Sequence, residues 1–446
     1  MIVFHLFLSI LWIILATARW KIHPLIALAV AAVWVGVAAG MHVSIAIEEF
    51  SKGFGSLIGQ IGLIIILGCV FGYLLEKSGA AMSLALKLWS SIGKRFPALS
   101  TGLMGSVVGI PVFCDAGFIL LDPVGKNLSK TSGISPLTFS LSLAGGLYLS
   151  HILIPPTPGP LAVAGMMQME QQLGVVLLLG ILLMIPVLLV VAWWAKRFAN
   201  QKLHEQLPEK ATANTPTATP IPSFFWSASV ISLPLLLIAI GNLHSLITNE
   251  ALGQVLKTAG NPFLAISCGL ALGFWKLKAP DGSNLMRIAF EKGIVTAGPI
   301  LILTGAGAGF GAILKQIGLQ EILQSWDMQP NSLLGWILLA FGMSAFLKTA
   351  QGSSTSAMII SASLLISMLP ADTGFSAIQT GLLISAIGAG AMSVSHANDS
   401  YFWIVKEFTG LTVSEALRSY TLLTFLMGVS TLGMIVVLAL LINLFY

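Results

Sequence analysis

Long stretches of this chain carry no Asp, Glu, Lys or Arg, and this feature restricts the possible fold more than any other. Each stretch exceeds the roughly 20 apolar residues that an α-helix needs to cross a bilayer. Only 9% of the residues are charged, against roughly 25% in an average soluble domain. The sequence therefore predicts an all-α integral membrane protein without a soluble catalytic domain. The charge-free stretches are 22–47, 53–75, 131–169, 171–195, 224–249, 293–314 and 419–446.

Polar, helix-breaking interruptions occur at corresponding places in the two halves of the chain. In the first half, residues 109–117 read GIPVFCDAG and residues 155–160 read PPTPGP. In the second half, residues 348–356 read KTAQGSSTS and residues 395–400 read SHANDS, at a similar spacing. Matched broken helices in the two halves of a membrane chain are typical of the binding sites of secondary transporters.

Four prolines require a helix break in the first half. Proline lacks an N–H group and clashes with the preceding turn, so all four cannot lie in one continuous helix. Backbone groups freed at membrane depth are tolerated only where they are buried in protein or line a cavity. The prolines are Pro155, Pro156, Pro158 and Pro160.

The polar, proline-rich segment 197–223 is expected to be a cytoplasmic linker between two repeats, 1–196 and 224–446. Each repeat is expected to contain five transmembrane helices, one of them discontinuous, and one re-entrant hairpin. In the first repeat, the hairpin is expected near 97–130, the broken helix near 137–169, and continuous helices near 2–18, 23–42, 57–76 and 172–195. In the second, the hairpin is expected near 332–370, the broken helix near 376–405, and continuous helices near 225–247, 260–275, 293–315 and 419–445.

An odd number of crossings in each repeat inverts the second repeat relative to the first. The positions of Lys and Arg support this arrangement. With both termini outside, 18 of the 22 basic residues lie on the cytoplasmic side, and Lys52, Lys257 and Lys315 lie outside, as the positive-inside rule requires. Lys348 lies within the second hairpin. The first hairpin then opens from the cytoplasm and the second from the outside.

Few ionisable side chains lie inside the predicted membrane segments. An intramembrane charge costs at least about 2.5–3.5 kcal/mol on insertion scales, so by default it marks a site or pathway. Asp115 and Asp399 are expected to be functional; the alternative is that each caps a half-helix or pairs locally. His151 and His396 are as consistent with neutral core histidines as with substrate or proton contacts.

Hydroxyl and amide groups beside the interruptions fit a small anion that itself carries hydroxyls. The half-helix that follows the second tip offers unpaired N–H groups and the positive end of a helix dipole. Asp115 is the first candidate for a proton carrier, and Asp399 and His396 are the others. The residues expected to contact substrate are Thr157, Gln351, Gly352, Ser353, Ser354, Thr355, His396, Asn398 and Asp399.

The motifs GIPVFCDAGFILL, HILIPPTPGPLAVA, KTAQGSSTSAMI and SHANDSYFWIVKEFTGLT resemble the gluconate permease family of bacterial inner-membrane symporters, within the ion transporter superfamily. The resemblance runs from about Pro24 to the C-terminus. It implies proton-coupled uptake of gluconate or a related sugar acid or small hydroxy acid. It also implies a homodimer in which a transport domain with both hairpins slides against a scaffold. Some members of the family carry D-serine or other hydroxylated acids.

Other functions remain open from the residues alone. A passive anion channel would use similar polar rings, and unwound carbonyls beside Asn398 and Ser400 could bind Na⁺ in place of proton coupling. An intramembrane enzyme is not expected, because no nucleophile with its base and no metal-ligand spacing occurs. No cofactor is expected beyond the coupling ion, H⁺ or Na⁺. Scattered basic residues form no stripe, so the expected partners are the lipid bilayer and a small carboxylate, and not nucleic acid.

Overall fold

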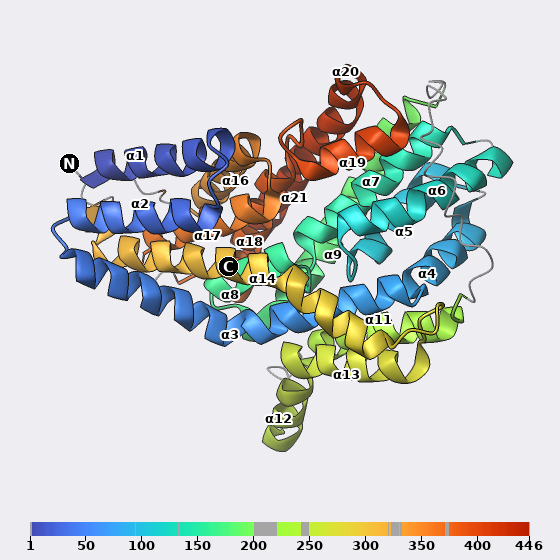
Figure 1. Cartoon of the computed structure of the whole chain (residues 1–446), viewed down its shortest axis with the longest axis horizontal. Coiled ribbons are helices and arrows are strands. Elements are labelled where there is room, and N and C mark those ends of the chain that lie inside the picture. The colour runs from blue at the N-terminus through green and yellow to red at the C-terminus, as the bar shows by residue number, and fades with distance from the viewer. Residues whose placement is uncertain are drawn as a thin grey trace.

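In the computed structural model of the protein, every regular secondary-structure element among the described residues is a helix (Figure 1). These residues are 2–93, 95–132, 134–199, 221–241, 249–319, 321–322, 330, 332–370 and 374–445. The prediction of an all-α protein is confirmed for them. Most of the predicted linker at 197–223 lies outside the described residues.

The first half of the chain forms helices at each predicted position. They are α1 (Ile2–Ile14), α2 (Pro24–Ala38), α3 (Val43–Lys77), α4 (Ala80–Leu88), α5 (Pro97–Gly109), α6 (Cys114–Ser132), α7 (Pro136–Leu153), α8 (Pro158–Met166) and α9 (Leu173–Lys196).

The second half contains a similar series. It comprises α11 (Phe224–Gly241), α12 (Glu250–Ala259), α13 (Pro262–Lys276), α14 (Leu285–Gln316), α16 (Leu333–Gln351), α17 (Ser354–Met368), α18 (Ala377–Met392), α19 (Ser400–Thr409), α20 (Val413–Ala416) and α21 (Leu422–Phe445).

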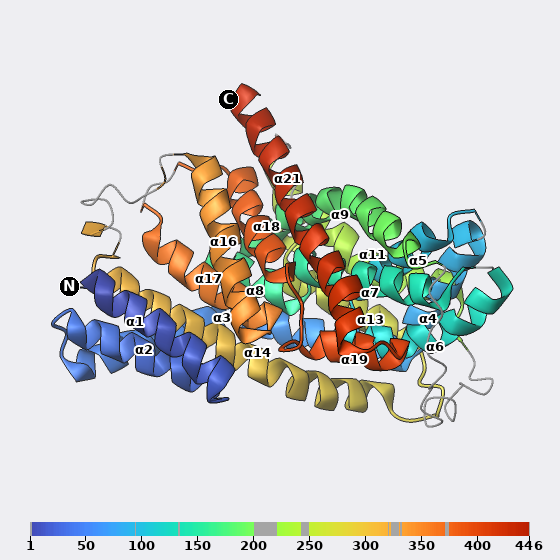
Figure 2. The same cartoon turned by 90° about the horizontal axis from the view of Figure 1, so that it is seen from above.

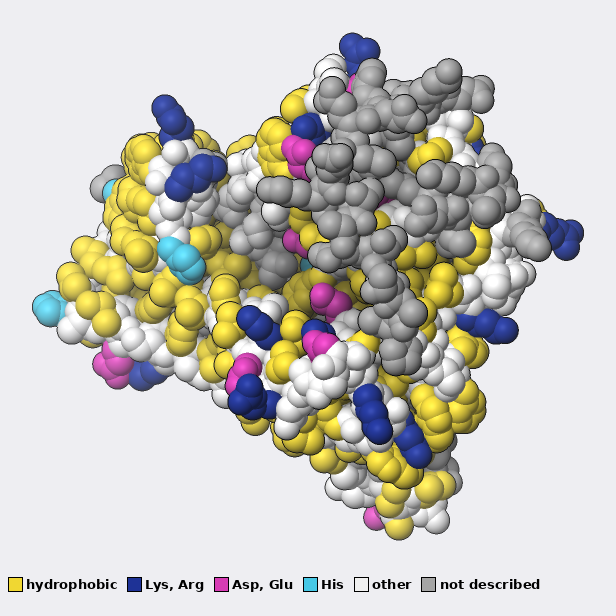
Figure 3. Space-filling view, turned by 45° about the vertical axis from the view of Figure 1, so that its right-hand side comes forward, with side chains coloured by type: hydrophobic (Ala, Val, Ile, Leu, Met, Phe, Trp, Pro, Cys, Tyr) yellow, Lys and Arg dark blue, Asp and Glu magenta, His cyan; other side chains and the backbone are white. Residues whose placement is uncertain are grey.

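The apolar character of the helices agrees with a membrane protein. Among the described residues, seven helical segments are long and apolar enough to cross a membrane, and α12 with α13, bent by 60°, would be an eighth. Large hydrophobic side chains face outward; Phe7, Leu63 and Val295 are 62–72% exposed. Figure 3 shows hydrophobic side chains over wide areas of one face, broken by small groups of charged ones. Such a surface is suited to lipid.

Two helices are longer than the charge-free stretches predicted. Helix α3 begins at Val43 and α14 at Leu285, whereas the expected starts were 57 and 293. The added N-terminal part of α3 contains Lys52, which forms an ion pair at 2.9 Å with Glu48, one turn away. Charged side chains stop a hydropathy pattern but not a helix, because i, i+4 pairs support helical structure. The short helix α12 was not predicted.

The first broken helix and α18 of the second are deeply buried elements. In the segment 136–166, which holds α7 and α8, the whole of the most apolar window is buried, against 28% of the window in 413–442. Every residue of α18 from Gly381 to Met392 is buried as well. The first broken helix and α18 therefore lie inside protein, whereas part of the second break and α19 reach the surface.

Helices α3 and α14 form a long pair along one side of the molecule (Figure 2). They pack along each other, with α1 and α2 beside one end of the pair and α11 and α13 beside the other (Figure 1). The remaining helices, including α16 to α18 and α21, lie on one side of this pair (Figure 2). Helix α5 packs on α7, and α16 packs on α18. Each helix that leads into a tip thus lies against a helix that leads into a break.

Glycine allows the closest of these contacts, between α5 and α7. A Cβ atom added to Gly146 would lie 1.9 Å from the carbonyl oxygen of Gly102 and 3.0 Å from the amide nitrogen of Ser106. The Ser106 hydroxyl donates to the Gly146 carbonyl at 3.1 Å. Small residues let membrane helices approach in this way.

We predict that Gly146→Ala separates α5 from α7. The clash is with backbone, which cannot rotate away, so the cost should be at least the roughly 1–3 kcal/mol typical of overpacking. The measurement is the apparent melting temperature of the purified protein in detergent. The matched control is Gly342→Ala in α16, where an added Cβ meets nothing within 4 Å and helix propensity should improve. Equal melting temperatures for the two variants would contradict the prediction.

Candidate functional site

The predicted site residues lie in two tips and two breaks, and the half-helices that follow these interruptions contact one another. The tip between α5 and α6 spans 110–113, and the tip between α16 and α17 spans 352–353. The breaks are 154–157 between α7 and α8, and 393–399 between α18 and α19. Helix α17 packs on α8, and α19 packs on α6. Each half-helix after a break therefore contacts the half-helix after the tip of the other half of the chain.

The second tip is pressed against the second break. Gly352 has φ +85°, and a Cβ there would lie 2.1 Å from the carbonyl oxygen of Asn398. The Asn398 side-chain amide donates to the Thr349 carbonyl at 2.8 Å, and His396 Nε2 lies 3.0 Å from the same oxygen. Only glycine fits this conformation at this distance.

A fully buried ion pair joins the same two segments. Lys348 Nζ lies 2.6 Å from Asp399 Oδ2, with side chains that are 0% and 8% exposed. Lys348 also donates to the Gly352 carbonyl, and the Ser395 hydroxyl donates to Asp399 at 2.5 Å. The other carboxylate oxygen accepts from the Tyr401 amide at 3.1 Å and caps α19. Both charges thus have several hydrogen-bond partners, as a buried pair needs.

Two half-helices point their N-termini toward this region. Ser353 caps α17, since its hydroxyl accepts from the Ser356 amide at 3.3 Å. A Cβ on Gly159, in the first turn of α8, would lie 4.0 Å from the Thr355 hydroxyl. The N-termini of α8 and α17 are therefore neighbours. Both helix dipoles favour an anion, but the unpaired N–H groups come mainly from α17, because in the first turn of α8 only Gly159 has one and Pro158 and Pro160 have none.

Some polar atoms near the tips have no partner among the described residues. Both polar atoms of the Gln351 side-chain amide are buried without a hydrogen-bond partner, and so is the Nδ1 atom of His151. The His151 ring lies 5.8 Å from that of Phe113 in the first tip. Buried polar groups are nearly always satisfied, so these atoms indicate a missing hydrogen-bond partner such as a ligand.

Asp115 lies at the start of α6, half-buried, with the Cys114 thiol 3.7 Å from its carboxylate. Both Asp115 and His151 interact electrostatically with Asp399 and Lys348. The ionisable groups that the sequence singled out one by one are therefore close enough to influence one another.

Thr157 is less well placed to contact a substrate. It is buried in the first break, and its hydroxyl donates to the Ile154 carbonyl at 2.5 Å. The four prolines of this segment are buried as well. By contrast, Ser353 and Asn398 are exposed, so the region is reached from the edge at the second tip.

One residue of this region was missed by the sequence reasoning. The Tyr148 hydroxyl lies 2.6 Å from the Ser354 hydroxyl, and Lys348 Nζ lies 5.8 Å from the Tyr148 ring centroid. Nothing in the charge-free stretch around Tyr148 marks it, because its role depends on contact with a helix more than 200 positions away.

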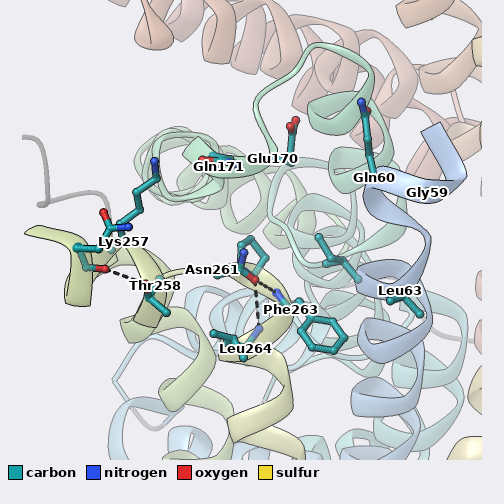
Figure 4. A pocket seen from close by; sticks show the side chains of 15 residues that line it. Gly59, Gln60, Leu63, Glu170, Gln171, Lys257, Thr258, Asn261, Phe263 and Leu264 are labelled. Carbon is teal, nitrogen blue, oxygen red and sulfur yellow. Dashed lines mark hydrogen bonds between the residues drawn. The ribbon is translucent and has the colours of Figure 1, made fainter. Parts of the chain in front are cut away.

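The larger cavities of the molecule lie elsewhere. A cavity of about 590 Å³ is lined by Gln60, Glu170, Lys257 and Asn261, among others (Figure 4). At the tips, a very small cavity lies among the described residues between the first tip, His151 and the first break. We place the candidate site at the tips, because the unpartnered atoms and the helix N-termini are there.

Known proteins resemble this chain over almost its whole length. The profile of the GntP family permeases matches residues 1–443. The chain belongs to the GntP permease family. The inner membrane permease YgbN of Escherichia coli is 32% identical over 94% of each chain. The gluconate permease of Pseudomonas aeruginosa is 29% identical over 97% of this chain and 96% of its own. The D-serine transporter DsdX of Escherichia coli is 29% identical over 97% of each.

A solved structure supports the fold of this GntP family member. The YdaH transporter of Alcanivorax borkumensis, which is described as having an unusual topology, superposes with a TM-score of 0.60 at 16% identity. The match covers 86% of this chain and 87% of that one. The protein is a multi-pass permease of the inner membrane with a small-molecule substrate, which confirms the predicted class.

We predict that the charges of Lys348 and Asp399 stabilise the permease only as a pair. Lys348→Met leaves a buried carboxylate without a counter-charge, at a cost of about 3–5 kcal/mol. Adding Asp399→Asn removes that charge and keeps an N-capping side chain. The double variant should therefore have a higher melting temperature than Lys348→Met alone.

The matched control is Lys52→Met. Lys52 is paired with Glu48 and Glu49 at the surface, and its loss should leave the melting temperature unchanged. Additive losses in the double variant would show that the two charges do not act together.

Proposed function

We propose that this permease imports gluconate or a related sugar acid or small hydroxycarboxylate by proton symport. The observation that carries the proposal is the meeting of two half-helix N-termini, from α8 and α17, beside a group of buried ionisable side chains. An anion with hydroxyl groups fits the N–H groups, hydroxyls and amides offered there. The names of relatives that carry gluconate support the same substrate class.

We assign the substrate carboxylate to the N-terminal turn of α17, with Ser353, Ser354 and Thr355. The Thr157 hydroxyl donates its proton to the Ile154 carbonyl, so we assign its oxygen to accept from a substrate hydroxyl. The substrate hydroxyls are assigned to Gln351, His396 and Asn398. Asp399 is held by Lys348, Ser395 and the Tyr401 amide, so its remaining capacity for substrate is small.

The same contacts bear on proton coupling. The Asp399 carboxylate is already paired with Lys348 at 2.6 Å. Asp115 has no such partner among the described residues, and its electrostatic interactions include a second carboxylate, Asp399. We therefore keep Asp115 as the coupling group, ahead of His396 and Asp399.

Helix pairings support two inverted repeats, 1–196 and 224–446. The contact of α1 with α2 corresponds to that of α11 with α13, and α5 on α7 corresponds to α16 on α18. The contacts of α8 with α17 and of α19 with α6 exchange under the same relation. Such repeats are typical of alternating access.

We further propose an elevator mechanism in a homodimer. The scaffold would contain the long pair α3 and α14, and the transport domain would contain both tips and both breaks. Gly68 and Gly72 of α3 face this domain; a Cβ on Gly72 would lie 2.3 Å from the Pro111 carbonyl oxygen. The two glycines leave this face of α3 without side chains, which suits sliding of the transport domain along the scaffold. Both termini are proposed to be periplasmic, in line with the positive-inside rule.

D-serine or another hydroxy acid is the alternative substrate, supported by the relative that carries D-serine. Sodium coupling is the alternative to proton coupling. A passive channel would not concentrate substrate, so concentrative uptake into proteoliposomes separates it from a symporter.

We predict that Asp115→Asn abolishes uptake driven by a pH gradient. The variant cannot carry a proton at this position, but substrate exchange across the membrane should persist. The measurement is accumulation of radiolabelled gluconate in proteoliposomes with an acidic exterior, with sodium and with choline in its place. Asp281→Asn, at an exposed carboxylate between α13 and α14, is the control. Accumulation by Asp115→Asn equal to wild type would remove Asp115 from this role.

We predict that Gln351→Leu weakens substrate binding without weakening the empty protein. Its amide atoms are buried without partners, so an apolar side chain of similar size should preserve or raise the melting temperature. The rise in melting temperature that gluconate produces in the wild type should shrink. The exposed Gln316, changed to Leu, is the control. A substrate-induced rise as large as in wild type would exclude a contact with Gln351.

A further inference from the structure

A second cavity lies between the proposed scaffold and transport helices, away from the tips. Its volume is about 210 Å³, and it is bordered by α3, α14, α17 and the end of α8. Its polar lining residues are Ser56, Gln60, Gln168, Lys315, Ser363 and Ser367. The name "Lys315 cavity" is used for it below.

The Lys315 cavity is connected to the candidate site by two helices. Helices α8 and α17 have neighbouring N-termini at the tips, where Gly159 approaches Met358 and Thr355. Their later residues, Gly165 on α8 and Ser363 on α17, both line the cavity. The two half-helices therefore run parallel, from the candidate site to the cavity. At 1.5 Å per residue, Ser363 lies roughly 13 Å along the axis from Ser354.

The charge of the cavity is positive. Lys315 is exposed and, among the described residues, forms no ion pair. No Asp or Glu is among the lining residues. Lys52, on the same helix as Ser56, differs: it is bound by Glu48 and Glu49, each at 2.9 Å. Lys315 is thus available to a ligand, and Lys52 is not.

The remaining polar groups suit an anion that carries hydroxyls. The side-chain amides of Gln60 and Gln168 are exposed at the cavity and can donate to a carboxylate. The Ser363 hydroxyl donates to the Gly307 carbonyl at 2.7 Å, which leaves its oxygen free to accept from a ligand hydroxyl. The volume is below the roughly 300–1,000 Å³ of ordinary ligand pockets, so only a small molecule fits.

The position of Lys315 at the end of α14 does not by itself explain the polar residues that line the Lys315 cavity. Lys315 lies in the last turn of α14, where a cation favours the helix dipole. That effect needs no cavity and no neighbouring amides. The larger cavity beside it shares Gln60 but contains Glu170, whose Oε2 atom is buried without a partner (Figure 4). A carboxylate makes that cavity the poorer place for an anion.

We propose that the Lys315 cavity is an entry site, at which the anionic substrate binds before it reaches the tips. The proposal rests on the proposed function, import of a small hydroxycarboxylate. The charge pattern of the sequence places Lys315 on the outer side, which is where an importer needs such a site. A fixed positive charge at the mouth of a cleft raises the local concentration of an anion, and salt screens this effect.

The test is initial uptake of radiolabelled gluconate by cells or right-side-out vesicles, at ionic strengths of roughly 0.01 M and 0.3 M. Lys315→Gln should raise KM about threefold at low ionic strength, with an unchanged maximal rate and a smaller difference at high ionic strength. Lys315→Glu should raise KM further, and Lys315→Arg should behave as the wild type. The matched control is Lys52→Gln, which should leave KM unchanged at both ionic strengths.

Two results would overturn the inference by itself. One is uptake by Lys315→Gln that matches Lys52→Gln at both ionic strengths. The other is a loss of maximal rate in Lys315→Arg as large as in Lys315→Gln, which would show a packing role. Failure of the wild type to take up gluconate or any other hydroxycarboxylate refutes the proposed function instead, and the entry site with it.

Discussion

Backbone groups released at membrane depth must be buried in protein, and the structure depends on this constraint. Residues 154–157 and 393–399 interrupt the two broken helices. No lipid can satisfy those groups. The first break is accordingly enclosed by the other helices, and the arms of the two tips pack directly against the broken helices. At the second break Ala397 and Asn398 are exposed, so the binding groups there are reached from the surface.

Burial of the breaks explains why so many glycines lie at helix contacts. At Gly146 the α5 backbone is close enough to exclude a Cβ atom, and at Gly352 the second tip lies against Asn398 in the same way. At these two points of contact there is no space for a side chain. Polar groups that do point into this region are therefore paired closely or, as with Gln351 and His151, have no partner.

The two halves of the site differ chemically in spite of their similar helix arrangement. The second half contributes a lysine, a carboxylate and a series of hydroxyls, whereas the first contributes Asp115, His151 and a break made of prolines. The ion pair of Lys348 with Asp399 fixes the second tip to the second break. Coupling then rests with the first half in our proposal, while substrate specificity rests mainly with the second.

The sequence by itself determined the helical class, the positions of both tips and both breaks, and membership of a permease family. These follow from local physics: charge-free length, prolines that cannot continue a helix, and polar groups at membrane depth. It did not determine the partners of those groups. Lys348 was left without a role, and Tyr148 was not considered, because each acquires its role only through contact with a distant segment. Tertiary structure also decided the lengths of α3 and α14 and the alignment of α8 with α17. Such features depend on packing between helices far apart in the chain, to which hydropathy and spacing are insensitive.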